Sequence, residues 1–217
     1  MKHTDKTLTL LKELKNKRDN LKYIGNEIME CRKHSMGYMD FVIIAIVNRS
    51  ISITVGIEKL IIEHNMTCVR ALLRMQLETV LTMAAFWLTE NPEKMAKEII
   101  VDGKKITDMK DKDGKRMTYS YLAKKIGKAF EWIPDLYRNT CEYIHFSERH
   151  LYDSIYSTNE EKRIAYFIIS EKDYNYPEHS WIEVIDYTRH CLFIIEVFLK
   201  KYKEIKEITR DKDKENL

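Results

Sequence analysis

Arg138, Asn139 and His145 are the residues of this chain whose types and spacing best suit a chemical reaction. On an ideal helix Arg138 and His145 stand two turns apart, within ~20° of one face and ~10 Å apart along the axis. A guanidinium holds a phosphate through a fork of donors, and an imidazole that titrates near neutrality moves a proton to or from a hydroxyl. The pair is therefore a minimal set for RNA cleavage without a metal.

This segment resembles the motif of the HEPN superfamily, helical domains whose ribonuclease members carry Arg, four to six intervening residues and then His. Here six residues separate Arg138 from His145, and Asn139 is the polar residue that usually follows the Arg in that family. Segments 72–78 and 137–147 also look like a group of poorly characterised bacterial helical proteins allied to it. The resemblance implies a metal-independent endoribonuclease that needs no cofactor.

In such an enzyme the ribose 2′-hydroxyl attacks the adjacent phosphate and leaves a cyclic phosphate and a free 5′-hydroxyl. The resemblance makes His145 the general base or acid, Arg138 the group that stabilises charge on the phosphate, and Asn139 the group that orients the phosphate or His145. It also implies a homodimer that joins two motifs at one cleft, with RNA as substrate. A toxin or antiphage effector restrained by an antitoxin or regulatory protein would fit that activity.

The sequence leaves two other interpretations of the chain open, a non-catalytic binding module and a structural dimer. Arg138 can be a surface residue that pairs with Glu142 one turn on, while His145 merely closes its helix. The chain is then a non-catalytic HEPN-like module that binds a nucleotide, RNA or a protein, or a structural dimer with a charged surface.

A polar set, Arg70, Arg74, Gln76 and Glu78, interrupts an otherwise apolar stretch. Arg70 and Arg74, and likewise Arg74 and Glu78, are one helical turn apart. Buried polar side chains need partners, so the set is either an ion-pair ladder between neighbouring helices or a support beneath the motif.

Tyr137, Arg149 and His150 flank the motif and are its remaining candidate contacts with RNA. Aromatic rings stack on bases and cations bind phosphates, while core packing and ordinary surface exposure are the alternative roles. Cys141 and His145 have the spacing of two metal ligands on a helix face. No second ligand pair accompanies them, so we predict no metal site.

The composition favours a mainly α-helical fold. Of the 217 residues 44% are apolar, and only 6 Gly and 3 Pro interrupt them, which favours long helices over turn-rich sheets. We expect one all-α domain over residues 1–210, a bundle of long antiparallel helices, followed by a charged flexible tail at 211–217. A mobile loop is expected near 102–117 and a small β-hairpin near 152–169.

Apolar residues at three- and four-residue spacings, together with capping residues, locate the individual helices. Asn65 is suited to cap a helix that the Asn91-Pro92 pair then stops, and Pro177 opens the last one. The predicted helices cover residues 7–33, 38–64, 65–90, 93–100, 118–130, 135–145 and 177–208.

Charge and targeting features narrow the classes of function. The 37 Lys and Arg oppose 34 Asp and Glu, and the net charge of +3 is too small to predict nucleic-acid binding, so any RNA contact must be local. The N-terminus carries no apolar export signal and the four cysteines are scattered, so we expect reduced thiols and a cytoplasmic location. The apolar run 41–47 is too short to span a bilayer, so we expect a buried helix and no membrane contact.

Overall fold

The computed structural model describes residues 3–31 and 36–215, so the first two residues, the end of the predicted helix 7–33 and residues 216–217 of the predicted tail lie outside it. The described residues form eight α-helices, one 3-10 turn and a single two-stranded antiparallel sheet. The prediction of a mainly α-helical bundle with a small hairpin is confirmed.

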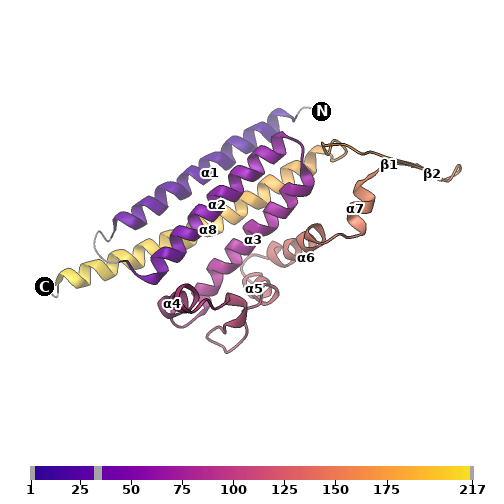
Figure 1. The fold of residues 1–217 in the computed structure, drawn as a ribbon. Helices are drawn as coiled ribbons and strands as arrows, with labels where there is room; N and C mark the ends of the chain where they lie inside the picture. Colours follow the sequence, from indigo (N-terminus) through magenta and orange to yellow (C-terminus); the bar gives the residue numbers. More distant parts are fainter. Residues whose placement is uncertain (1–2, 32–35, 216–217) are drawn as a thin grey trace.

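Four long helices lie side by side and form the body of the molecule (Figure 1). They are α1 (Asp5–Glu30), α2 (Tyr38–Ile62), α3 (Met66–Leu88) and α8 (Glu178–Glu215). α1, α2 and α3 alternate in direction as predicted, but α8 lies parallel to α1: Thr4 bonds to Glu178 at one end and Glu27 pairs with Lys203 near the other. The chain between α3 and α8 has therefore returned to the end of the bundle where α1 begins.

The short elements between α3 and α8 pack on the lower side of α3 in Figure 1 and then leave the bundle. They are α4 (Pro92–Asp102), the 3-10 turn η1 (Ile106–Asp108), α5 (Tyr119–Ile126), α6 (Trp132–Ile144), α7 (Glu148–Asp153), β1 (Ile155–Asn159) and β2 (Ile164–Phe167). The sequence did not predict α7, because six residues are too few to show a helical period.

Helix ends follow the local chemistry of the sequence. The Asn65 side chain accepts a hydrogen bond from the Cys68 backbone N–H at 2.9 Å and opens α3. Asn91 does the same for Lys94 at 2.9 Å, with Pro92 in the first turn of α4, and Gly103 ends that helix at φ 66°. The last helix behaves differently from the prediction, because α8 runs on from the expected end near 208 to Glu215.

The predicted loop at 102–117 contains a buried carboxylate rather than only solvated charge. Asp111 is 6% exposed and accepts hydrogen bonds from the backbone N–H groups of Asp113 and Lys115 at 3.0 and 2.8 Å. The Tyr121 hydroxyl of α5 donates to its other oxygen. Asp111 thus closes the loop onto α5, and the backbone bonds give it the geometry of a turn.

α2 is the one described helix whose length and apolar composition would suffice to cross a membrane. Half of its most apolar window is buried inside the bundle, where α2 packs against α1, α3 and α4. A core helix of this kind meets the same criteria as a membrane span.

Candidate functional site

The HEPN-like motif lies on α6 and just beyond its end. α6 buries Ile133, Leu136 and Thr140 against α3, and the same period leaves Arg138 and Asn139 exposed. The helix ends one residue before His145, whose backbone is extended at φ −100° and ψ 139°. The ideal-helix geometry expected for the motif therefore stops short of the histidine.

Arg138 and His145 are both exposed and are not joined to each other by a hydrogen bond within residues 3–31 and 36–215. Arg138 donates to Asp135 at 2.6 Å, and the two side chains are 72% and 71% exposed. The expected partner Glu142 pairs with Arg149 instead, so the partner predicted for Arg138 was wrong, whereas its place on the surface in an ion pair agrees with that interpretation. Arg138 pairs with Asp135 because Asp135 lies about one turn before it on the same exposed side of α6.

Asn139 connects the motif to a small cavity. It lines a space of about 120 Å³ between α3, α6 and α8, together with Arg70, Tyr143, Arg149 and Glu183. Its lining includes two guanidinium groups, each already paired with a carboxylate, Arg70 with Asp153 and Arg149 with Glu142. The cavity therefore has donors suited to an anion, which would have to displace those carboxylates.

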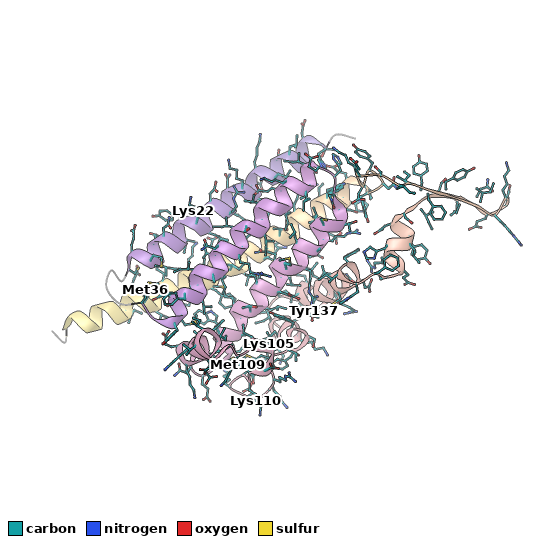
Figure 2. All side chains as sticks on the ribbon, in the orientation of Figure 1. Lys22, Met36, Lys105, Met109, Lys110 and Tyr137 are labelled. Carbon is teal, nitrogen blue, oxygen red and sulfur yellow. The ribbon has the colours of Figure 1, made fainter. Side chains whose placement is uncertain are left out.

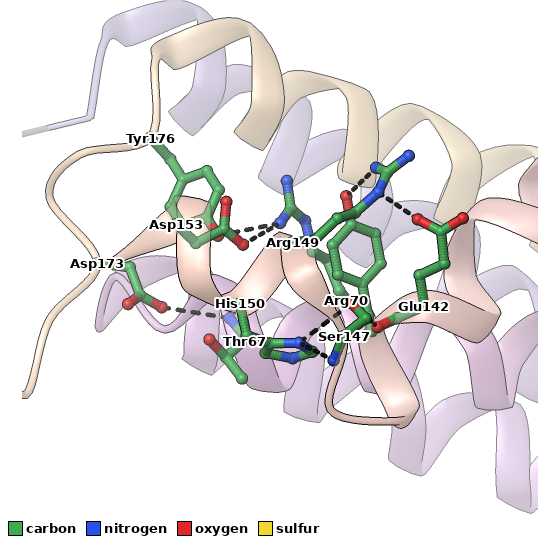
Figure 3. A network of polar contacts seen from close by, with 10 residues as sticks. Thr67, Arg70, Glu142, Ser147, Arg149, His150, Asp153, Asp173 and Tyr176 are labelled. Carbon is green, nitrogen blue, oxygen red and sulfur yellow. Dashed lines mark hydrogen bonds and ion pairs between the residues drawn. The ribbon is translucent and has the colours of Figure 1, made fainter. Parts of the chain in front are cut away.

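Arg70 ties three segments together at this cavity. Its guanidinium lies between two aromatic rings, 4.1 Å from the centre of Tyr143 and 4.5 Å from that of Tyr176. It donates to the Tyr176 hydroxyl at 3.0 Å and to Asp153 at 3.3 Å (Figure 3). Burial raises the pKa of Tyr176, and Asp153 raises it further, so this hydroxyl remains protonated at neutral pH.

His150 is held in place more firmly than His145. Its Nδ1 accepts a hydrogen bond from the Ser147 backbone N–H at 3.2 Å, and its ring stacks on Phe146 at 5.5 Å. Figure 3 shows His150 bonded to Ser147, close to Arg149 and Asp153, which have their own partners. His150 also lines a second polar cavity of about 170 Å³. The Nδ1 atom of His150 is therefore already occupied by the Ser147 backbone.

Arg74 of α3 bonds to α6, which agrees with the interpretation of the polar set as a support for the motif. It is 4% exposed and donates to Glu78 at 2.9 Å, to the Tyr137 carbonyl at 2.7 Å and to Cys141 Sγ at 3.1 Å. Its guanidinium also covers the Tyr137 ring at 3.7 Å. Burial by itself would lower the pKa of Arg74, but the bonds to Glu78 and Tyr137 raise it above its ordinary value. The ring and the carbonyl of Tyr137 are therefore both in contact with Arg74.

Gln76 takes no part in a ladder with its neighbours on α3. It is fully buried, and neither atom of its amide has a hydrogen-bond partner within the described part of the chain. The predicted polar set thus divides into Arg70 at the cavity, Arg74 with Glu78 under α6, and Gln76 in the core.

Replacing Arg74 with Met is expected to lower the free energy of unfolding by about 1.5–3 kcal/mol. Met fills much of the same volume but leaves the Tyr137 carbonyl and the Glu78 carboxylate without their donor. Urea unfolding followed by circular dichroism measures the change. Arg116→Met is the control, since Arg116 is 63% exposed in its ion pair with Asp108, and equal losses in both variants would contradict the buried role.

Sequence reasoning missed the residues that complete the network around Arg70. They are Asp153 and Tyr176, which come from α7 and from the segment before α8. No spacing in the sequence relates them, because the fold brings them together.

Among residues 3–31 and 36–215, no three His, Cys, Asp or Glu side chains gather as a set of metal ligands. Comparison with known proteins adds no relative: no protein-family model, no curated protein and no solved structure matches this chain.

Proposed function

We propose that the protein is a metal-independent endoribonuclease of HEPN type, with Arg138, Asn139 and His145 as its reacting residues. One observation carries the proposal: Asn139, inside the motif, lines the cavity that Arg70 and Arg149 also line. Neither Arg138 nor His145 lines that cavity: Arg138 is the neighbour of Asn139 on α6, and His145 is the first residue after the helix ends. The chain thus carries donors suited to a phosphate along α6 and an exposed imidazole directly after it.

The reaction follows from those groups. His145 takes the proton of a ribose 2′-hydroxyl, whose oxygen forms a bond to the adjacent phosphorus while the bond to the 5′-oxygen breaks. Arg138 stabilises the charge that develops on the phosphate oxygens, and Asn139 donates to one of them. The leaving 5′-oxygen receives a proton from an imidazolium, which a second copy of the chain would supply in a homodimer. The products are a cyclic phosphate and a 5′-hydroxyl.

A cytoplasmic toxin or antiphage effector, restrained by an antitoxin or a regulatory protein, is the biological role that we attach to this activity. Cleavage of cellular RNA is harmful to the host, so such an enzyme requires restraint. The proposal therefore includes a protein partner that covers the end of α6.

Purified protein is expected to cleave end-labelled RNA in the presence of excess chelator. The products should carry 2′,3′-cyclic phosphate and 5′-hydroxyl ends, which enzymatic end analysis distinguishes from other termini. Intact RNA after long incubation, or cleavage that disappears when the chelator is added, would contradict the proposal.

A non-catalytic module that binds RNA, a nucleotide or a protein is the second candidate, and one feature favours it. The exposed cations of the site are paired with carboxylates of the same chain, Arg138 with Asp135 and Arg149 with Glu142. A ligand can displace such surface pairs at little cost, since they contribute little to stability. Retention of RNA in a filter-binding assay without cleavage would support this candidate.

A further inference from the structure

A cavity of about 410 Å³ lies between α2, α3, α4 and the turn η1, and we refer to it as the α2–α4 cavity. Figure 1 shows α4 against the start of α2 and the end of α3, and Figure 2 labels Lys105, the residue before η1, at the same end of the bundle. This volume is in the range of ~300–1,000 Å³ that is usual for small-molecule sites. Within the described residues it shares no lining residue with the cavity beside Asn139, so it is separate from the proposed RNA site.

The walls of the α2–α4 cavity are almost entirely apolar. Of its eleven described lining residues, eight are hydrophobic, two are threonines and one, Arg49, is charged. Phe41 and Ile100 in these walls remain 51% and 47% exposed, whereas Ile46 and Phe86 are buried. The single chain therefore leaves apolar surface in contact with water at this cavity, and an apolar ligand would cover it.

Arg49 gives the cavity the one cation of its described lining. Its Nε donates to Thr79 Oγ1 at 3.0 Å, and the Thr79 hydroxyl donates in turn to the Met75 carbonyl at 2.9 Å. Within residues 3–31 and 36–215 the guanidinium has no ion pair with a carboxylate. Thr79 therefore holds Nε in place, while the two terminal nitrogens keep their donors for a ligand.

Arg49 stands at one end of the cavity. The lining residues of α2 run from Phe41 to Arg49, and eight residues of helix span ~12 Å. Because α3 runs in the opposite direction, Thr79 lies at the Arg49 end and Phe86 lies toward Phe41. With C–C bonds of ~1.5 Å, an extended alkyl chain of about ten carbons spans that distance. The cavity is thus apolar along its length and cationic at one end.

We propose that the α2–α4 cavity binds a fatty acid of medium chain length, whose carboxylate bonds to Arg49 and whose alkyl chain lies along α2 toward Phe41. A guanidinium donates two parallel hydrogen bonds to a carboxylate, and such charge-assisted bonds are about twice as strong as neutral ones. One cation balances the single charge of a carboxylate. A phosphate monoester carries nearly two negative charges at neutral pH and would call for a second cation.

A neighbouring cavity of about 290 Å³ does not suit the same head group. Ile46 and Phe86 line both cavities. The described lining of the neighbouring cavity includes the carboxylates Glu90 and Glu93 and no cation. An anionic head group would be repelled there, so the position of Arg49 sets the orientation of the ligand.

The shape and the charge of the α2–α4 cavity favour a single amphiphile over a membrane surface. Peripheral proteins bind a membrane through an outward apolar face that several cations flank. The α2–α4 cavity is concave and has one cation among its described residues. We therefore assign it to a free fatty acid rather than to a lipid within a bilayer.

Isothermal titration calorimetry of the full chain with sodium decanoate, kept below its micelle-forming concentration, is expected to show one site with a dissociation constant of roughly 1–100 µM. Arg49→Met should raise that constant about 10-fold or more, because the substitution removes the charge but keeps most of the side chain's length. The same variant should change the affinity for 1-decanol, which has the same chain and no charge, by less than about 2-fold. Lys59→Met is the matched control, since Lys59 is an exposed cation of α2 outside the cavity.

Ala45→Trp tests the apolar wall independently of charge. Ala45 is exposed on α2 and lines the cavity, so a bulky ring at this position fills the space for the alkyl chain. Binding of both decanoate and 1-decanol should be lost. Far-UV circular dichroism of both variants should match that of the wild-type chain, because Arg49 and Ala45 are exposed.

Three results would overturn the fatty-acid site. They are a wild-type chain that does not bind decanoate, a decanoate affinity that Arg49→Met lowers no more than Lys59→Met does, and unchanged binding in Ala45→Trp. A chain that binds anionic phosphatidylglycerol vesicles but not monomeric decanoate belongs to the first case and assigns this surface to a membrane. The site does not rest on RNA cleavage, so a chain that binds decanoate but has no nuclease activity would contradict the proposed function alone.

Discussion

His145→Ala and Arg138→Ala are each expected to lower the rate of RNA cleavage by about 100- to 10,000-fold, and the double variant should have no measurable activity. The first substitution removes the proton acceptor, and the second removes the cation that stabilises the phosphate. Both side chains are exposed, so the helical bundle should keep its stability. Single-turnover cleavage with RNA of defined sequence measures the rates.

Two matched variants control for loss of a surface charge or imidazole. Arg116→Ala removes an arginine that is exposed and paired with Asp108, as Arg138 is with Asp135. His179→Ala removes an exposed histidine of α8. Both controls should cleave at the wild-type rate, and full activity in the Arg138/His145 double variant would disprove the mechanism.

His150→Ala tests which of the two histidines that follow α6 transfers the proton. His150 is hydrogen-bonded through Nδ1 and stacked on Phe146, whereas His145 has no side-chain hydrogen bond within the described residues. The proposed mechanism predicts that His150→Ala retains most of the activity. Loss of cleavage in this variant, with activity kept in His145→Ala, would transfer the proton-transfer role to His150.

Asp40→Ala is expected to lower the free energy of unfolding by about 3–5 kcal/mol. Asp40 is 2% exposed at the start of α2, and it accepts hydrogen bonds from Lys206 Nζ at 2.5 Å and the Tyr202 hydroxyl at 2.8 Å, both from α8. Its other oxygen accepts from the Gly37 backbone N–H at 2.9 Å. Without the carboxylate, Lys206 would keep a buried charge that lacks this partner.

Equilibrium unfolding in urea measures this loss, and two further variants test its cause. Glu204→Ala breaks the exposed pair with Lys201 on the same helix and should cost less than about 0.5 kcal/mol. Asp40→Ala combined with Lys206→Met should recover much of the lost stability, because no charge then remains buried. A double variant as unstable as Asp40→Ala alone would show that the ion pair is not the cause.

The sequence allowed the helices to be predicted because helix formation is mainly local. Apolar residues at helical spacing, the Asn65 and Asn91 caps and the Pro92 stop all act within one or two turns, and the structure uses each of them. The end of the final helix could not be predicted from local patterns. Its charged end reads as a flexible tail in sequence, yet α8 continues to Glu215.

The candidate site was predicted only in part. Arg138, Asn139 and His145 were found through their spacing, but their surroundings depend on contacts between distant segments. Arg70 lies 83 residues from Asp153 and 106 residues from Tyr176. No local pattern encodes such contacts, because they form only after α3 and α6 have packed.

By itself, the sequence determined a mainly α-helical bundle, the ends of most of its helices and the segment 138–145 from which we propose RNA cleavage. Only the tertiary structure decided that α8 lies parallel to α1, that Arg74 supports α6, and that Asn139 opens onto a cavity lined by Arg70 and Arg149. The physical reason is the sequence distance over which each interaction acts. Capping and helical periodicity act over a few residues, whereas burial and ion pairing join side chains that are far apart in the sequence.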